Sequence, residues 1–164
     1  MENSYNVMRR AVSREYNYYI LNSETRSPLR DRFYYQVPRQ LNIPAMNEAA
    51  QALVGEHDFA SFVNHEEAAK RNTVKNVLKS EVKKDGDTVI FNIIANGFLM
   101  HQVRNTVGCL VKVGQGKMSV AEYNKILDAK QPCLAAPTAP AGGLCLIKVN
   151  YPSSVGRNVE DGKL

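Results

Sequence analysis

An arginine on an apolar helix is the residue of this sequence with the clearest potential for chemistry. The stretch 96–116 predicts a helix entered through Gly97 and closed at Gly114 or Gly116, a usual place for a left-handed cap. Its apolar residues recur every three or four positions and form one face: Leu99, Val103, Val107, Leu110 and Val111. Arg104 lies beside that face, where a guanidinium removed from water needs a partner.

The spacing alone supports two interpretations of Arg104. In the first, the side chain extends along the apolar surface to reach water or holds a structural carboxylate, which is common for long cationic side chains. In the second, Arg104 lines a site and holds a catalytic acid in its ionised form. The helical pattern by itself leaves both interpretations open.

Other reactive side chains carry weaker signals. His57 and Asp58 are adjacent, so they are poorly placed to face each other, and a structural turn is the expected role. Cys109, Cys133 and Cys145 lack metal-ligand spacing and predict reduced thiols in a cytoplasmic protein. The segment Gly114–Lys117 follows a helix and lacks the spacing of a phosphate-binding loop. None of these groups predicts a metal site.

Length and composition suit one domain or one half of a larger enzyme. The chain has 164 residues, of which 44% are hydrophobic, as expected for a packed core. We assign the domain to residues 1–152 and expect the polar tail 153–164 to fray. No apolar run approaches the roughly 18 residues of a membrane span, and no signal segment is visible. We therefore expect a cytoplasmic location without a membrane partner.

The net charge of +5 is moderate, but the basic residues gather in two regions. The first region holds Arg9, Arg10, Arg14, Arg26, Arg30, Arg32 and Arg39, and the second holds Lys70, Arg71, Lys75, Lys79, Lys83 and Lys84. Basic stripes attract phosphate backbones, although a solvated surface explains any single charge equally well. The distribution makes nucleic acid a candidate partner.

The remaining segments predict an α+β fold, with helices on one face of a mostly antiparallel sheet. Alternation predicts strands at 12–22, 73–83, 88–95 and 144–151, and apolar spacing predicts helices at 41–54 and 119–130. We expect a short extended piece at 33–37, a turn at 55–62, and loops at 23–32, 64–72 and 132–143. Asp85-Gly86 predicts a hairpin. Asn42 is a plausible N-cap of the first helix, and Ser119 with Glu122 predicts a capping box at the start of the last. Strand 88–95 is nearly apolar on both faces and should be central, whereas the imperfect alternation of 73–83 predicts a bulge or edge irregularity. The second face of the sheet would then be free to hold a ligand.

Tyrosines cluster in the first predicted strand. Period-two alternation places Tyr16, Tyr18 and Ile20 on one face. Such clusters usually reflect strand propensity, but a tyrosine at the edge of a sheet can also stack on an unpaired base.

The segment Gly97–Gly108 reads GFLMHQVRNTVG and closely resembles the "GF…H.VRN.VG" signature of the tRNA pseudouridine synthase A family. The strings at 55–62 and 136–152 also resemble that family's "GEHDF.SF" and "GPTAP..GL.L..V.YP". The resemblance covers about Tyr5 to Pro152. It implies half of the pseudouridine synthase fold, in which an antiparallel sheet continues into a second, similar half.

The resemblance also implies an activity, the isomerisation of uridine to pseudouridine in the anticodon stem-loop region of tRNA. Uracil is detached from its sugar, turned, and rejoined through carbon, which requires no metal or redox cofactor. The reaction requires a carboxylate nucleophile, a cation that keeps it ionised, a stacking ring and a dry pocket. The target base must first leave its stack.

Site residues follow from the resemblance, position by position. Arg104 would pair with the catalytic aspartate, and Tyr16, aligned through Arg14-Glu15-Tyr16-Asn17-Tyr18, would pack on the flipped base. Leu144 and Leu146 would floor the pocket. Arg14 would contact the substrate. His101 would also approach the tRNA, or it would be a polar helix residue whose hydrogen bonds are satisfied within the protein. Glu15 departs from the family, where a basic residue is common.

The nucleophile is the main departure. The family carries it in "R-T-D-x-G-V-H-A", a context that none of the aspartates here has: Asp31, Asp58, Asp85, Asp87, Asp128 and Asp161. Tyr5–Val7 resembles the family sequence shortly downstream of that string. We therefore expect the C-terminal part of a synthase, inactive alone, whose partners are tRNA, the missing N-terminal half and a second copy in a homodimer.

A competing hypothesis is a noncatalytic RNA-binding module. In that case the open face of the sheet would present Tyr16 and Tyr18 to single-stranded RNA. A third class, a protein-interaction domain, would show no salt-dependent RNA binding.

Overall fold

The structure, a computed structural model, describes residues 12–30, 32–135 and 137–151. The predicted domain limit at 152, the tail 153–164 and the family match at Tyr5–Val7 lie outside the described residues.

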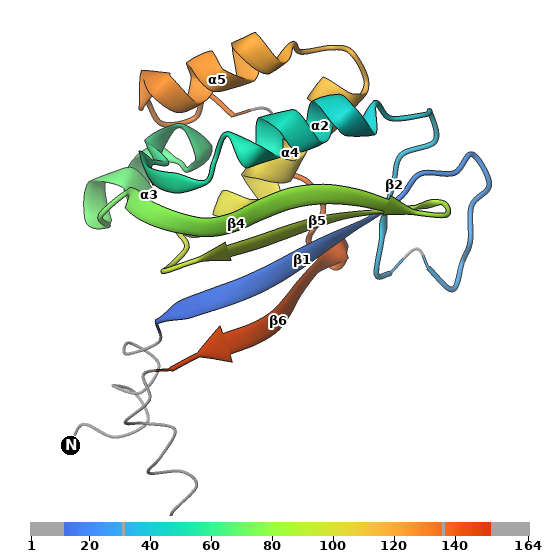
Figure 1. Cartoon of the computed structure of the whole chain (residues 1–164), viewed down its shortest axis with the longest axis horizontal. Helices are drawn as coiled ribbons and strands as arrows, with labels where there is room; N and C mark the ends of the chain where they lie inside the picture. The colour runs from blue at the N-terminus through green and yellow to red at the C-terminus, as the bar shows by residue number, and fades with distance from the viewer. Residues whose placement is uncertain (1–11, 31, 136, 152–164) are drawn as a thin grey trace, which may run out of the picture.

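A six-stranded sheet with helices on one face forms the fold (Figure 1). Its strands are β1 (Ser13–Leu21), β2 (Tyr35–Gln36), β3 (Gly55–Asp58), β4 (Val74–Asp85), β5 (Thr88–Ala95) and β6 (Leu144–Asn150). The order is β2-β1-β5-β4-β3, with β6 also paired to β1. Every pair is antiparallel except β1–β2, which is parallel. The predicted α+β class and the central position of β5 are therefore confirmed.

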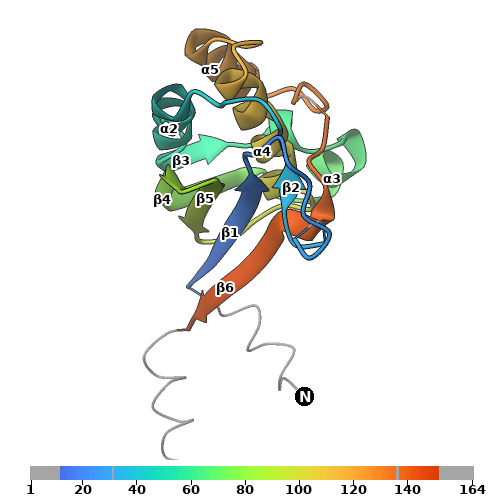
Figure 2. The same cartoon turned by 90° about the vertical axis from the view of Figure 1, so that its right-hand side faces the viewer.

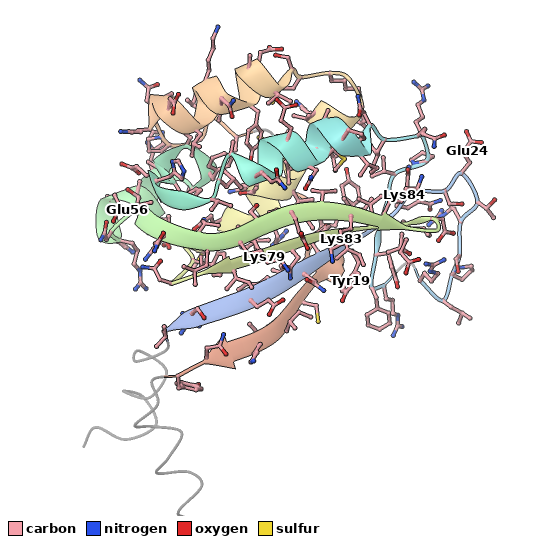
Figure 3. The ribbon with its side chains drawn as sticks, in the orientation of Figure 1. Tyr19, Glu24, Glu56, Lys79, Lys83 and Lys84 are labelled. Atoms are coloured by element: carbon pink, nitrogen blue, oxygen red, sulfur yellow. The ribbon has the colours of Figure 1, made fainter. Side chains whose placement is uncertain are left out.

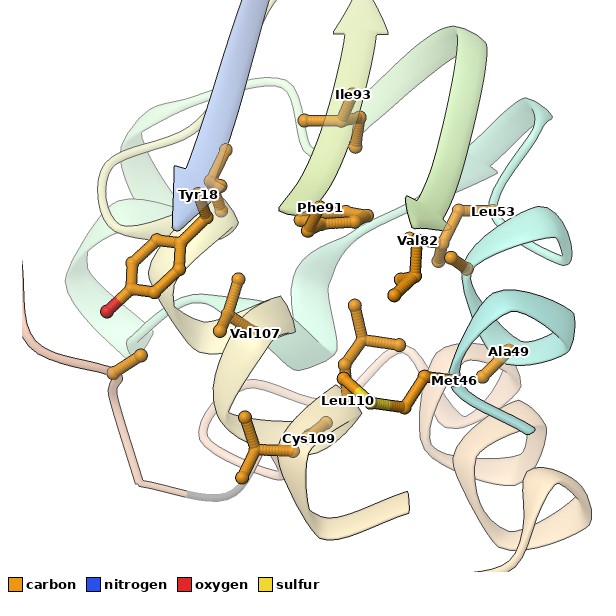
Figure 4. Packing of buried hydrophobic residues seen from close by; sticks show 14 of the residues in the cluster. Tyr18, Met46, Ala49, Leu53, Val82, Phe91, Ile93, Val107, Cys109 and Leu110 are labelled. Atoms are coloured by element: carbon orange, nitrogen blue, oxygen red, sulfur yellow. The ribbon is translucent and has the colours of Figure 1, made fainter. Parts of the chain in front are cut away.

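Helices α2 (Ile43–Gln51), α4 (Gln102–Gly114) and α5 (Val120–Ala129) lie above the same face of the sheet, as the two views of Figures 1 and 2 show. The core lies between the sheet and these helices, where Phe91 and Ile93 of β5 meet Val107 and Leu110 of α4 (Figure 4). In the described part of the chain, no helix combines the length and apolarity that crossing a membrane requires.

The helix α4 is shorter at its start than its sequence pattern predicts. It begins at Gln102, and His101 before it adopts a left-handed conformation with φ 62°. Its C-terminal end matches the prediction, because Gly116 has φ 77°. The N–H of Lys117 donates to the Lys112 carbonyl (2.9 Å) and that of Gly116 to the Val113 carbonyl (3.1 Å). This is the Schellman arrangement, which satisfies carbonyls that a helix end leaves unpaired.

Two predicted connectors form regular structure, which corrects the sequence-based expectation. The predicted loop 64–72 contains α3 (His65–Lys70), capped by Asn64, whose side chain accepts from the Glu67 N–H (2.8 Å). This helix has no buried residue, so the apolar pattern that reveals longer helices is missing. The predicted turn 55–62 contains β3, which pairs with β4, followed by the 3₁₀ turn η1 (Ala60–Phe62).

Local signals at other element ends are confirmed. Asn42 caps α2 by accepting from the Ala45 N–H (3.2 Å). Ser119 and Glu122 form the predicted capping box of α5. Gly86 makes the hairpin turn with φ 64°, and the register of β4 shifts between Val77 and Lys79, the irregularity that imperfect alternation predicts.

Gly143, at the end of the 3₁₀ turn η2 (Ala141–Gly143), allows the chain to pass close to β1. A Cβ atom there would lie 2.7 Å from Cε1 of Tyr18 and 2.8 Å from the carbonyl oxygen of Tyr19. The obstruction includes backbone, which cannot rotate away. Glycine is therefore required for β6 to begin beside Tyr18.

We expect Gly143→Ala to lower the free energy of unfolding by about 1–3 kcal/mol, the usual range for overpacking. Urea denaturation monitored by circular dichroism measures the change. Gly97→Ala is the matched control, because its nearest neighbour would be the Lys75 Nζ at an ordinary 3.5 Å. Equal stability of the two variants would contradict the close approach.

Candidate functional site

Three of the predicted site residues, Tyr16, Leu144 and Leu146, lie with Tyr18 on the helix-side face of β1 and β6. Tyr16 is opposite Leu146, and Tyr18 is opposite Leu144. Tyr18 is 0% exposed whereas Leu146 is 50% exposed, so the cover provided by the helices ends between these pairs. Figure 2 shows β1 and β6 extending beyond the helix layer. Tyr16, Leu144 and Leu146 lie along this end of the face, which we call the floor of the site.

Tyr16 is partly buried, and its ring is positioned by an aromatic neighbour. The ring of Phe98, in the turn before α4, meets that of Tyr16 edge-on at a centroid distance of 5.0 Å and an interplanar angle of 89°. Edge-to-face pairs of this kind are favourable and hold rings in fixed orientations. Phe98 belongs to the site although sequence reasoning gave it no role; its place in the GF motif was the available signal.

Arg104, in the first turn of α4, is partly buried and held by a reciprocal pair of hydrogen bonds. Its Nε donates to the Ala139 carbonyl (2.8 Å), and the Ala139 N–H donates to the Arg104 carbonyl (3.1 Å). Among the described residues, no carboxylate forms an ion pair with Arg104, and no group accepts from its two terminal nitrogens. The cation is thus oriented, but its terminal nitrogens are left for another acceptor.

The segment that holds Arg104 is itself tied to α4. The Thr138 hydroxyl donates to Oδ1 of Asn105 (2.6 Å), and Nδ2 of Asn105 donates to the Phe62 carbonyl (2.6 Å). The Tyr18 hydroxyl donates to the Pro140 carbonyl. The resemblance implied that this segment abuts the active site, but no role was predicted for Asn105 or Thr138, although both lie within the family strings.

Burial raises the pKa of Tyr18 well above its usual value, and the neighbouring Tyr35 raises it further, while the positive charge of Arg104 opposes both. Tyr18 therefore stays protonated at neutral pH and acts as a hydrogen-bond donor. Arg104 and Tyr18 donate to consecutive carbonyls, those of Ala139 and Pro140, so both side chains lie against the same short segment. The floor of the site is consequently uncharged apart from Arg104 itself.

Two further predicted residues lie at the margin of the site. His101 is exposed and immediately precedes α4 in a left-handed conformation, which is uncommon for a non-glycine residue and is concentrated at functional positions. Arg14 is partly buried on β1, opposite Ala95 and Val149. In the described chain, no cluster of three or more His, Cys, Asp or Glu side chains is arranged to hold a metal ion.

The competing hypothesis of an RNA-binding module placed Tyr16 and Tyr18 on the open face of the sheet, and this placement is wrong. Tyr16 and Tyr18 point to the side of the helices, since Tyr18 belongs to the buried core and Tyr16 packs against that core. The open side of β1 instead carries Glu15, Asn17 and Tyr19, of which Tyr19 is labelled in Figure 3. Oε2 of Glu15 accepts from Nδ2 of Asn92 (2.7 Å), so this departure from the family has a local structural partner.

The sequence that forms this site is similar to that of known RNA-modifying enzymes. A sequence profile described as tRNA pseudouridine synthase matches residues 49–152. The chain belongs to the tRNA pseudouridine synthase family. Its helix α4, the Arg104–Ala139 pair and β6 all lie within the matched region, so the candidate site is built mainly from the family's own segment.

Relatives named tRNA pseudouridine synthase A agree with this family assignment. The protein of Acidiphilium cryptum (strain JF-5) is 43% identical over 141 residues, 86% of this chain and 55% of that protein. That of Methylacidiphilum infernorum (isolate V4) is 40% identical over 146 residues, 87% and 56% of the two chains. That of Francisella tularensis subsp. novicida (strain U112) is 39% identical over 152 residues, 93% and 58%. This synthase-family chain spans little more than half the length of these curated relatives.

We expect the stability of the chain to fall above pH 10 partly through Tyr18. The unfolded phenol titrates near 10.0 and the folded one higher, so the unfolded state alone loses its proton as the pH rises past 10. Each pH unit in that window should cost about 1.4 kcal/mol of unfolding free energy per such group. Urea denaturation at pH 8, 10 and 11 should show a smaller decline for Tyr18→Phe than for the wild type.

Tyr19→Phe is the matched control for this measurement, because Tyr19 lies on the open face and is only partly buried. It should keep the wild-type decline. If Tyr18→Phe and wild type declined in parallel between pH 10 and 11, the buried donor role of Tyr18 would be refuted.

Proposed function

We propose that this chain supplies the arginine-bearing half of the active site of a tRNA pseudouridine synthase, which isomerises uridine in the anticodon stem-loop region of tRNA. The observation that carries the proposal is the state of Arg104. Its guanidinium is partly buried, oriented through Nε, and free of ion pairs with the described residues. A cation left in this state is suited to an acidic group that arrives from elsewhere.

The acid in this proposal is an aspartate carried by a second, similar half-domain. The positive charge of Arg104 would favour the ionised form of that carboxylate and fix its direction, as required of a nucleophile. Limited access of water at the partly buried position strengthens the attraction relative to a surface pair. Arg104 would therefore keep the aspartate both charged and aimed at the sugar carbon from which uracil departs.

The surrounding residues receive roles that match their positions. Tyr16, braced by Phe98, would pack on the flipped base. Leu144 and Leu146 would floor the pocket and keep it dry. His101 and Arg14, at the margin, would contact the tRNA. No metal or cofactor enters the proposed chemistry, and the location would be cytoplasmic.

The second half-domain would dock beside β6. Among the described residues, β6 pairs only with β1, so its other edge presents unpaired backbone groups. Leu146 and Ile147 on this strand are 50% and 44% exposed. An edge strand with exposed apolar side chains is a ready template for a further strand. A sheet that continues through β6 into the second half-domain would bring the aspartate of that half-domain toward Arg104. We also expect the completed enzyme to form a homodimer.

The alternative is a noncatalytic RNA-binding module. It is supported by the net charge of +5 and by the lack of a described carboxylate paired with Arg104. Because Tyr16 and Tyr18 do not lie on the open face, such a module would use basic side chains instead of those tyrosines. Replacing Arg104 would lower the affinity of such a module for RNA modestly, and no turnover would be present to change.

Reconstitution tests the proposal. The chain, mixed with or fused to the N-terminal half of the Acidiphilium cryptum relative, should release tritium from tRNA labelled at uridine C5, whereas neither half should do so alone. In the reconstituted protein, Arg104→Gln should lower kcat by about 10²–10³, a typical loss for one preorganised electrostatic contact. Affinity for tRNA, measured by filter binding, should change less than threefold.

Lys125→Gln, an exposed substitution on α5, is the matched control and should leave kcat unchanged. Two results would overturn the proposal. One is turnover by the 164-residue chain alone that disappears in Asp58→Ala. The other is an Arg104→Gln variant that weakens tRNA binding without a loss in kcat, as the alternative requires.

A further inference from the structure

Two hollows flank the segment Pro38–Gln40, at the end of the sheet where the β4–β5 hairpin lies. One, of about 550 Å³, is lined by Asn22, Ser23, Glu24, Pro38, Arg39, Gln40 and Lys84. The other, of about 370 Å³, is lined by Pro38, Arg39, Gln40, Gln115 and Lys117. Both hollows adjoin the segment Pro38–Gln40, which lines each of them, and we call the two hollows together the basic groove.

Three exposed cations line the basic groove and come from three separate segments. Arg39 follows β2, Lys84 lies near the end of β4, and Lys117 follows α4. Among the described residues, none of the three forms an ion pair. Glu24 is the one acid among the lining residues, and Figure 3 shows it and Lys84 at the same end of the sheet. Positive charge therefore prevails in the groove.

The walls of the groove are held by hydrogen bonds. Nδ2 of Asn22 donates to the carbonyls of Val37 (2.9 Å) and Arg39 (2.6 Å), which braces the segment between the two hollows. The Asn42 N–H donates to the Gly114 carbonyl (2.8 Å). Together with the Schellman bonds of Gly116 and Lys117, this bond occupies the last carbonyls of α4, which would otherwise repel an anion. A preformed cationic surface results.

The basic groove and the Arg104 site lie at opposite ends of α4. Eleven residues separate Arg104 from Gln115, which corresponds to about 16 Å along a helix. One strand of double-stranded DNA carries a phosphate about every 3.4 Å along its axis, and at a similar spacing this distance spans roughly five phosphates of an RNA strand. An RNA with one nucleotide at Tyr16 is long enough to reach the groove with its backbone.

We propose that the basic groove binds the phosphate backbone of RNA through Arg39, Lys84 and Lys117, as a contact separate from the Arg104 site. The proposal rests on RNA being the substrate in the proposed function, and it assigns the groove a positioning role away from the reacting base. The contacts are to phosphate, so they carry no sequence preference.

The salt dependence of tRNA binding tests this contact. Affinity of the 164-residue chain for unmodified tRNA is measured by fluorescence anisotropy from 50 to 300 mM KCl, for wild type and for Arg39→Gln/Lys84→Gln/Lys117→Gln. Each phosphate contact contributes about 0.7–0.9 to the slope of log K against log salt. The triple variant should therefore lower the magnitude of the slope by about two to three.

A second triple variant, Lys125→Gln/Lys130→Gln/Lys148→Gln, removes the same charge from exposed positions on α5, after α5 and on β6, outside both basic regions of the sequence. It should leave the slope within about 0.5 of wild type. Circular dichroism melts confirm that both variants fold. Equal slopes for the two triple variants, or no salt-dependent binding by the wild-type chain, would overturn the proposal.

Kinetics of the reconstituted enzyme separate this proposal from the catalytic one. The groove variant should raise KM for tRNA with kcat kept, the reverse of Arg104→Gln. Reconstitution could yield no activity while the groove variant still lowers the salt dependence of tRNA binding. In that case the proposed catalytic function is wrong and the proposed phosphate contact of the basic groove is supported.

Discussion

The reciprocal hydrogen bonds between Arg104 and Ala139 are the constraint on which the candidate site depends. A partly buried guanidinium is costly unless its donors are satisfied, and one of its donors is satisfied by backbone that α4 itself fixes. The same pairing orients the remaining donors. Asn105, Thr138 and Tyr18 hold the 137–140 segment, so the direction of the cation is set by four elements at once: α4, this segment, η1 and β1.

A second constraint is the uneven cover of the sheet. Tyr18 and Tyr16 are two residues apart on the same face of β1, yet the first is part of the core and the second lines the floor of the site. The same change occurs along β6, where Leu144 packs against the core and Leu146 is half exposed. The strand β1 therefore contributes Tyr18 to the core and Tyr16 to the floor of the site. A change in core packing around Tyr18 would consequently shift Tyr16 as well.

Sequence reasoning succeeded where the determinants are local. The caps at Asn42 and Ser119, the hairpin at Gly86 and the Schellman glycine at Gly116 all act within a few residues. It failed for α3 and β3, because a six-residue helix without a buried face and a short edge strand leave no periodic signal. For the site, alternation placed Tyr16 and Tyr18 on one face correctly, but which face the helices cover is a tertiary property.

The partner of Arg104 was also beyond local reasoning, since Ala139 is 35 residues away and contributes only backbone atoms. The role assigned to the terminal guanidinium nitrogens stays a prediction. A crystal structure of the chain assembled with an N-terminal half that carries the family's aspartate tests it most directly. We predict that a carboxylate oxygen of that aspartate lies within 4 Å of a terminal nitrogen of Arg104 and beside Tyr16. A guanidinium bound instead to another group, with the aspartate remote from it, would contradict the account.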